Sequence, residues 1–241
     1  MISFFRRKNY VCDVEWLGVD MHNHLLPDID DGAVDVAQSV GFIKELAELG
    51  FHNFFCTPHI FTELYPNTIE TITPALEDVK AALVKANLNV EIAAAAEYMV
   101  DETFKITKNL LCLPGRHILI EMSYLSEMPQ IEKVVFDLQL AGYKVILAHP
   151  ERYGFYHKKL ERYDRLKDMG VLFQLNLLAL VGYYGTEVKS VAQRLLKKNY
   201  YDFAGTDLHH SRHLKAIKDL ICTGKLYKMI GNYPFKNKLL L

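Results

Sequence analysis

Two histidines separated by a single residue, His22 and His24, are the first side chains along the chain whose spacing suits chemistry. Residues i and i+2 of a strand point to the same side, so both imidazoles can approach one ion. Imidazole binds zinc, manganese and iron, so the pair indicates a metal without selecting one. Residues 28–32, DIDDG, then place three carboxylates in a turn that glycine makes tight. Two histidines alone are not a site, because a strand-end pair followed by an acidic helix cap explains the same residues.

Short apolar runs alternate with amphipathic segments along the chain. We expect strands at residues 17–22, 53–57, 90–97, 117–121, 143–149, 171–176 and 201–207. We expect helices at residues 35–49, 74–86, 129–141, 160–169, 186–198 and 211–230. Most helix patterns end at a residue that favours a left-handed C-cap, namely Gly50, Asn87, Gly142, Gly170 and Asn199. This order predicts βα units with a parallel sheet, and seven strands favour a barrel-like α/β fold in a single domain over residues 1–241.

Residues that can bind a metal recur where the expected strands end. They are His22 and His24, His59 just beyond Thr57, Glu97, Glu121, His149, Asn176, and Asp207 with His209. In a βα barrel the C-terminal strand ends face one shared mouth, where active sites are built. Burying so many titratable groups without a cation would cost several kcal/mol each, so the pattern predicts a polynuclear metal site. Spacing leaves open whether His210 replaces His209, and we interpret Asp28 and Asp30 as a helix cap or as supports for the ligands.

Two arginines follow candidate ligands at the same distance: Arg152 lies three residues after His149, and Arg212 lies three residues after His209. A planar guanidinium beside a metal cluster suits bidentate binding of a phosphate. The alternative for both arginines is a surface ion pair. Nearby tyrosines pack in the core by default, although some can line the mouth: Tyr153, Tyr156, Tyr183 and Tyr184.

Composition excludes several classes of protein. The net charge of −1 and the absence of a basic stripe argue against nucleic-acid binding. The four cysteines are far apart and form no C-x-x-C pair, which fits a reducing compartment. No apolar run follows the first ten residues, and Gln174 and Asn176 interrupt the longest apolar run, near residues 171–181. We therefore expect no signal peptide and no membrane insertion, a cytoplasmic location, and a C-terminal tail at residues 236–241.

Several segments together are recognisable as a family pattern: DMHNHLLPDIDDGA from residue 20, TPH (57–59), AAAAEYM (93–99), LIEMS (119–123), ILAHPERY (146–153) and AGTDLHH (204–210). They resemble the PHP (polymerase and histidinol phosphatase) superfamily, and within it the bacterial tyrosine phosphatases encoded with capsule and exopolysaccharide genes. The DDGA and HPERY segments are the most specific to the phosphatase branch. The sequence departs from the family at Ile60 and Phe61, because some members carry basic residues directly after the TPH histidine. This departure concerns the surface that meets the substrate and not the metal ligands.

The resemblance implies a distorted seven-stranded (β/α) barrel that holds three metal ions, usually manganese and sometimes iron or zinc. The ligands that it implies are His22, His24, Asp31, His59, Glu97, Glu121, His149, Asp207 and His209. Glu97 would bridge two of the ions, and Arg152 and Arg212 match positions that handle the phosphate.

The activity implied by the resemblance is that of a metal-dependent protein-tyrosine phosphatase. A metal-bound hydroxide would attack phosphorus in line, while the arginines and metals hold the equatorial oxygens. The implied partner is the phosphotyrosine-rich tail of a tyrosine kinase of polysaccharide synthesis.

Three alternatives stay open at this point. A small-molecule phosphatase of the histidinol-phosphate type would use the same metal chemistry behind a different mouth. A nuclease or polymerase-editing role is weaker, because the composition shows no basic stripe. A catalytically silent metal-binding scaffold is the third, and the full ligand set with both arginines argues against it.

Overall fold

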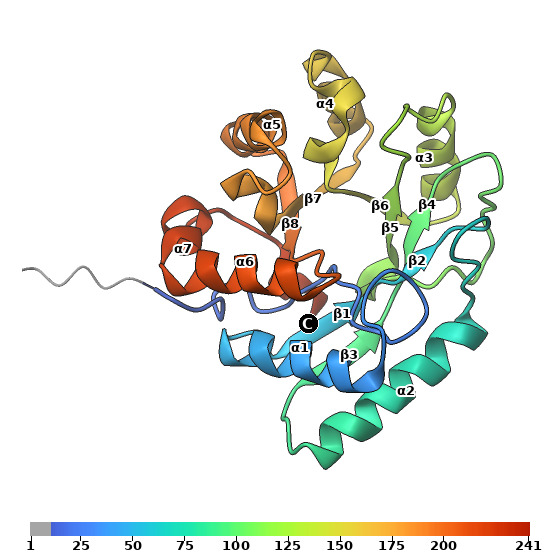
Figure 1. The fold of residues 1–241 in the computed structure, drawn as a ribbon. Helices are drawn as coiled ribbons and strands as arrows, with labels where there is room; N and C mark the ends of the chain where they lie inside the picture. The colour runs from blue at the N-terminus through green and yellow to red at the C-terminus, as the bar shows by residue number, and fades with distance from the viewer. Residues whose placement is uncertain (1–10) are drawn as a thin grey trace, which may run out of the picture.

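The computed structural model describes residues 11–241, with helices arranged around the outside of the strands (Figure 1). The N-terminal segment for which we expect no signal peptide lies almost wholly outside this range. The strands are β1 (Asn53–Cys56), β2 (His59–Ile60), β3 (Glu91–Ala94), β4 (Glu97–Met99), β5 (His117–Glu121), β6 (Lys144–Ala148), β7 (Leu172–Asn176) and β8 (Tyr201–Gly205). The α-helices are α1 (Val36–Glu48), α2 (Ile69–Lys85), α3 (Ile131–Leu140), α4 (Leu160–Asp168), α5 (Thr186–Lys197), α6 (Ser211–Cys222) and α7 (Lys225–Ile230). Short 3-10 helices are η1 (Pro114–Arg116), η2 (Pro150–Arg152), η3 (Gly154–Tyr156), η4 (Leu177–Val181) and η5 (Asn237–Leu240).

The strands pair in parallel in two sheets. One sheet has the order β1-β3, and the other has the order β2-β4-β5-β6-β7-β8. The fold is therefore a mixed α/β fold with parallel sheets, as the alternation of patterns predicts. The described strands do not form one set of seven, so closure into a seven-stranded barrel stays a prediction.

The segment before α1 lies between the two sheets. The Asp20 N–H donates to the Asn53 carbonyl at the start of β1 (3.0 Å), and the Asp207 N–H beyond β8 donates to the His22 carbonyl (2.8 Å). The expected strand at residues 17–22 is wrong in its extent, because in this segment only Asp20 forms a strand-type bridge, with Phe54. Gly18 has a φ of +86°, a turn conformation that interrupts an extended run.

The expected strand at residues 90–97 is divided into β3 and β4, which belong to different sheets. Between them, the Ala95 N–H donates to the Cys56 carbonyl and the Glu97 N–H donates to the Pro58 carbonyl. The chain thus changes partner at two small buried residues, Ala95 and Ala96, where little side-chain volume hinders the crossing. The periodicity of the sequence cannot predict this change of sheet, because the change depends on where the other strands lie.

The expected helix ends are confirmed by the backbone. Gly50, Asn87, Gly142, Gly170 and Asn199 all have positive φ, the conformation that ends a helix at glycine or asparagine.

Two of the expected helices have different boundaries. The helix α2 begins at Ile69 rather than at Pro74, since Thr68 and Thr71 form a capping box that starts it earlier. The last expected helix is divided into α6 and α7 at Gly224, whose φ is +67°. None of the described helices combines the length and the apolar character that a membrane crossing requires.

The C-terminal segment docks on the core through its buried residues Asn237 and Leu240, so the prediction of a tail at residues 236–241 is wrong. Leu240 of η5 packs into a cluster of buried strand residues that includes Val19, Leu119, Ile146 and Phe203. Figure 1 marks the end of the chain next to β1, in the region between α1 and α6. Leu240 therefore fills apolar space between buried side chains of the strands.

Asn237 fixes this arrangement through three hydrogen bonds. Its Oδ1 accepts from the Ala204 N–H (3.0 Å), and its Nδ2 donates to the carbonyls of Ala204 (2.7 Å) and Val19 (3.0 Å). The side chain is completely buried. A short amide therefore joins β8 to the segment that leads into the first histidine pair.

We predict that Asn237→Ala lowers the free energy of unfolding by about 3 kcal/mol, because it leaves buried backbone groups without partners. Urea denaturation with the metal content held constant measures this change. Leu239→Ala, at a neighbouring residue that is 77% exposed, is the matched control and should change stability by less than about 0.5 kcal/mol. Equal effects of the two substitutions would contradict the role given to Asn237.

Candidate metal centre

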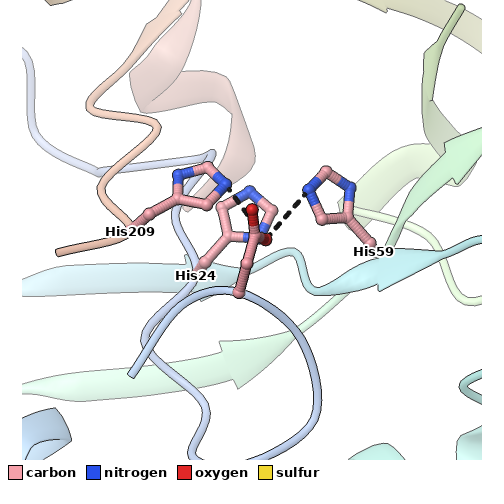
Figure 2. Close-up of side chains that lie close together, drawn as sticks. His24, His59 and His209 are labelled. Atoms are coloured by element: carbon pink, nitrogen blue, oxygen red, sulfur yellow. Dashed lines mark ion pairs between the residues drawn. The ribbon is translucent and has the colours of Figure 1, made fainter. Parts of the chain in front are cut away.

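The structure brings together all nine residues that the sequence proposes as metal ligands. They form three groups in which one donor atom from each residue lies within 4.8 Å of the others: His24, Asp31, His59 and His209; His22, Glu97, His149 and Asp207; and His59, Glu97 and Glu121. Figure 2 shows the imidazoles of His24, His59 and His209 close together, although they come from distant parts of the sequence. The Nε2 atoms of His59 and His209 lie 3.5 and 3.6 Å from Asp31 Oδ1.

Glu97, at the start of β4, belongs to two of the three groups, and it also lies close to two histidines of the remaining group. Its Oε1 lies 3.0 Å from His149 Nε2, while its Oε2 lies 3.1 Å from His22 Nε2 and 3.4 Å from His24 Nε2. His59 Nδ1 is 3.2 Å from the same Oε2. The two oxygens of one buried carboxylate thus face different sets of imidazoles, as a bridging ligand requires.

The ends of the strands position these side chains in two different ways. Glu97 and Glu121 belong to β4 and β5 themselves, whereas His149 and Asp207 follow the last residues of β6 and β8. His149 and Asp207 have φ of +33° and +49°, a left-handed conformation that residues other than glycine rarely adopt. Such strain persists where the surrounding structure enforces it, and it is common at functional sites.

Hydrogen bonds at Nδ1 orient three of the imidazoles. His22 Nδ1 lies 2.9 Å from Gln174 Oε1, His24 Nδ1 lies 2.8 Å from Asp30 Oδ2, and His209 Nδ1 lies 2.9 Å from the Asp207 carbonyl. When Nδ1 donates in each of these bonds, the Nε2 lone pair faces the cluster and is free to bind a metal. Asp30 therefore supports a ligand, which is one of the two roles that the sequence allows it.

The cluster contains two buried carboxylate oxygens that have no hydrogen-bond partner in the described chain, Glu97 Oε2 and Asp207 Oδ1. Two metal–ligand bonds of about 2.1 Å that meet at 90–110° place their donor atoms about 3.0–3.4 Å apart. The spacings of His22 Nε2 from Glu97 Oε2 (3.1 Å) and from Asp207 Oδ1 (3.4 Å) fit that range. The residues therefore fit divalent cations, and their mixture of imidazole and carboxylate suits first-row transition metals.

Proton binding is the other way in which the buried charge can be balanced. Burial lowers the pKa of His22 and His24, but the nearby carboxylates outweigh it and raise both above the ordinary value. Burial and His24 also oppose protonation of His59, yet the hydrogen bond to Glu121 and the charge of Glu97 raise its pKa to about 9. Without a cation, then, the raised pKa values favour protons on His22, His24 and His59, which a metal must displace.

Arg152, in η2, is fixed beside the cluster by three contacts. Its Nη1 donates to Asp207 Oδ2 at 2.9 Å. Its guanidinium carbon lies 4.5 Å from the centre of the Tyr124 ring and 4.3 Å from the centre of the Tyr184 ring, so both rings make cation–π contacts with it. Arg212 lies in the first turn of α6, is exposed, and is not among the residues that line the cavity described next.

A cavity of about 350 Å³ opens onto the cluster. Its polar part includes Asp31, Glu121, Arg152 and five histidines, and its apolar part includes Phe61, Leu64, Tyr65 and Met99. Arg152 is the only lysine or arginine that lines it among the described residues. His210 also lines it, but this residue forms the N-cap of α6 and belongs to none of the three ligand groups.

Sequence reasoning missed several supporting residues. Gln174 also accepts from the His149 N–H (3.1 Å), and it is completely buried. Glu151, also buried, accepts from the Asn176 N–H and the Tyr201 hydroxyl, and burial raises its pKa to about 7. The available signal was that polar residues such as Gln174 interrupt apolar strands, because a buried polar group needs a partner. Tyr153 and Tyr156 are core residues, as expected, whereas Tyr184 lines the cavity.

A family model described as "Capsular polysaccharide synthesis, CpsB/CapC" matches residues 18–239, nearly the whole chain. The chain belongs to the CpsB/CapC family. Within the range of that match lie all nine candidate ligands and both arginines.

Relatives of this CpsB/CapC chain have been named for an activity. Tyrosine-protein phosphatase YwqE of Bacillus subtilis (strain 168) is 29% identical over 196 residues, which cover 80% of this chain and 77% of the relative. Tyrosine-protein phosphatase CpsB of Streptococcus pneumoniae is 24% identical over 201 residues, which cover 80% of this chain and 83% of the relative. A solved structure described under "YwqE from Bacillus subtilis and CpsB from Streptococcus pneumoniae, unique metal-dependent tyrosine phosphatases" matches with a TM-score of 0.79 at 26% identity, covering 92% of this chain and 94% of that chain.

We predict that manganese stabilises the protein more at pH 8.5 than at pH 6. The folded-state pKa of His59, about 9, lies above its unfolded value, so the stability that this proton supplies is fully present below about pH 6.5 and is lost as pH rises through 9. A cation that replaces the proton competes less well at low pH. Urea denaturation with and without manganese at both pH values measures the difference.

In the same experiment, Glu97→Gln should lose most of the stabilisation by manganese, because it removes a carboxylate of the ligand set. Glu102→Gln, at an exposed glutamate outside the cluster, is the control and should keep that stabilisation. A metal effect that is equal at both pH values, or that survives in Glu97→Gln, would contradict the proposed ligand set.

Proposed function

We propose that this protein is a metal-dependent tyrosine-protein phosphatase, which hydrolyses the phosphate monoester of phosphotyrosine on a protein. The observation that carries the proposal is the position of Arg152 at the edge of a buried cluster of imidazoles and carboxylates that opens into a cavity. The names of the CpsB/CapC relatives supply the class of substrate.

We assign the metal to the nine clustered residues, and we propose three ions with manganese as the preferred metal. The three groups of donor atoms support the number of ions, and the position of Glu97 between the groups supports a bridging role. Cations bound there would supply a water of lowered pKa and would neutralise charge on the phosphoryl oxygens. Manganese accepts both imidazole and carboxylate ligands, which is the donor mixture present here.

The chain's own residues would bind and orient the substrate. Arg152 would hold the non-bridging phosphoryl oxygens, since its planar guanidinium presents parallel donors and its position is fixed by Asp207 and two tyrosine rings. The tyrosyl leaving group has a pKa near 10, so its departure needs less help from an acid than that of an alkoxide. No cysteine lines the cavity within residues 11–241, which is consistent with a mechanism without a thiolate nucleophile.

For Arg212 we propose a second contact to the phosphate. The residue is exposed at the start of α6, next to His210, which lines the cavity. A long flexible side chain at that place can turn towards a bound anion.

We further propose that residues 1–241 form one domain, closed as a distorted seven-stranded barrel, that acts in the cytoplasm. Hydrogen bonds from the segment of Asp20 and His22 to β1 and to Asp207 support closure, since they connect the two sheets on one side. The name of the family, capsular polysaccharide synthesis, supports a partner in that process, namely the phosphotyrosine-bearing tail of a bacterial tyrosine kinase.

The first test is phosphate release from a tyrosine-phosphorylated peptide and from histidinol phosphate, each with manganese and then with a chelator. We expect release from the peptide that the chelator abolishes. A preference for histidinol phosphate would keep the metal centre and replace the substrate, while no release from either ester by metal-loaded protein would indicate a silent scaffold.

We predict that Arg152→Lys lowers kcat/KM for the phosphotyrosine peptide by about 100-fold, because an ammonium cannot reproduce the planar, paired donors. Steady-state kinetics on manganese-loaded protein measures the loss, and metal content measured in parallel shows that the cluster remains intact. Arg212→Lys is the matched substitution. A loss below twofold in that variant would remove Arg212 from the phosphate site, and a similarly small loss in Arg152→Lys would refute the proposed role of Arg152.

A further inference from the structure

The cavity has one wall that the proposed chemistry does not use. Phe61, Leu64 and Tyr65 line it together, and Met99 at the end of β4 continues the same apolar surface. The first three belong to one small turn directly after β2, which we call the 61–65 hairpin. A surface of this composition is suited to an apolar group of the ligand.

The 61–65 hairpin is held in place rather than hanging free. Phe61 and Tyr65 exchange backbone hydrogen bonds of 2.9 and 2.8 Å. At its base, Asn67 Nδ2 donates to the His59 carbonyl (2.9 Å) and to the Ile29 carbonyl (2.6 Å). The hairpin is therefore connected to the backbone of His59 and to the acidic turn that precedes Asp31, both of which belong to the candidate metal centre.

Leu64 stands out on this wall because 66% of its surface is exposed. Among the large hydrophobic side chains that are exposed in residues 11–241, only Leu64 and Tyr124 line the cavity. A scattered exposed leucine needs no explanation, but one at the mouth of a cavity, beside Phe61, provides apolar surface that a ligand can cover.

Two other aromatic residues of the cavity, Tyr124 and Tyr184, already contact Arg152. The guanidinium carbon lies over both rings, at 4.5 and 4.3 Å from their centres. One face of each of these rings is therefore covered by the arginine that would hold the phosphate. The 61–65 hairpin then remains as the apolar surface for the group that carries the phosphate.

We infer that the 61–65 hairpin, through Leu64 and Phe61, receives the aromatic ring of the substrate and so selects aryl over alkyl phosphate monoesters. The inference deepens the proposed function and rests on it for the identity of the ester. Apolar contact with the ring would stabilise the bound substrate and the transition state equally, because the ring does not change during the reaction. The hairpin is accordingly a specificity element that acts on KM and leaves kcat nearly unchanged.

The test compares Leu64→Ala and Phe61→Ala with the unchanged protein, all full-length and loaded with manganese. Isothermal titration calorimetry gives the affinities for phenylphosphonate, methylphosphonate and inorganic phosphate. These anions have three phosphoryl oxygens in common and differ in the fourth group on phosphorus. We expect each variant to bind phenylphosphonate about fivefold more weakly, from the loss of apolar contact area. Affinities for methylphosphonate and phosphate should stay within twofold.

Kinetics on the phosphotyrosine peptide provides the second readout, in which KM should rise about fivefold while kcat changes less than twofold. Leu140→Ala is the matched control, because Leu140 is 77% exposed and does not line the cavity. Circular dichroism checks the folding of every variant, and Leu64→Gln replaces Leu64→Ala if that variant is not folded.

Equal weakening for phenylphosphonate and methylphosphonate, or no weakening in either variant, would overturn the inference. Hairpin-dependent preference for phenylphosphonate in a protein that does not hydrolyse phosphotyrosine would keep the inference and refute the proposed function. If the protein hydrolyses phosphotyrosine but its affinity for phenylphosphonate does not depend on the hairpin, the proposed function stands and the inference is refuted.

Discussion

The buried charge of Glu97 and Asp207 is the constraint on which the rest of the site depends. Both side chains are buried, and each has one oxygen without a hydrogen-bond donor among the described residues. An unpaired carboxylate in a medium of low dielectric constant is strongly destabilising. The surrounding imidazoles balance this charge when they hold protons, and divalent cations balance it when those protons leave. The same carboxylates therefore account for the fit of divalent cations to this site and for the expectation that pH controls their binding.

The backbone brings these groups together at some conformational cost. Parallel strands place their C-terminal ends on the same side, so residues that are far apart in sequence meet there. His149 and Asp207 then leave the strands in a left-handed conformation, and Gln174 fixes both His149 and His22 through one amide. A centre whose ligands are held by hydrogen bonds from neighbouring strands keeps its geometry while protons and ions exchange.

The sequence predicts this site better than it predicts the connections of the chain. Several candidate ligand positions follow from a local rule, in which a metal-binding residue after an apolar run marks a strand end, and β5 has the boundaries expected for it. Glu97 and His59 depart from the rule, because they begin β4 and β2. The division of residues 90–97 between two sheets and the docking of Asn237 do not follow from local pattern. Asn237 contacts Val19, 218 residues away, and His22 contacts Gln174, 152 residues away. Such pairs become visible only when the strands are arranged in space.

Asp207 connects the two halves of the proposed chemistry. Its Oδ1 lies 3.4 Å from both His22 Nε2 and His24 Nε2, while its Oδ2 accepts from Arg152 and from Asn176 Nδ2 (2.7 Å). One oxygen is thus directed to the cations and the other to the arginine that would bind phosphate. Cations bound at Oδ1 and the guanidinium at Oδ2 would share the negative charge of one carboxylate. That charge would then neutralise neither group fully, and the remaining positive charge would attract an incoming phosphate dianion. In the proposed function, cation binding and phosphate binding would therefore be coupled through a single side chain.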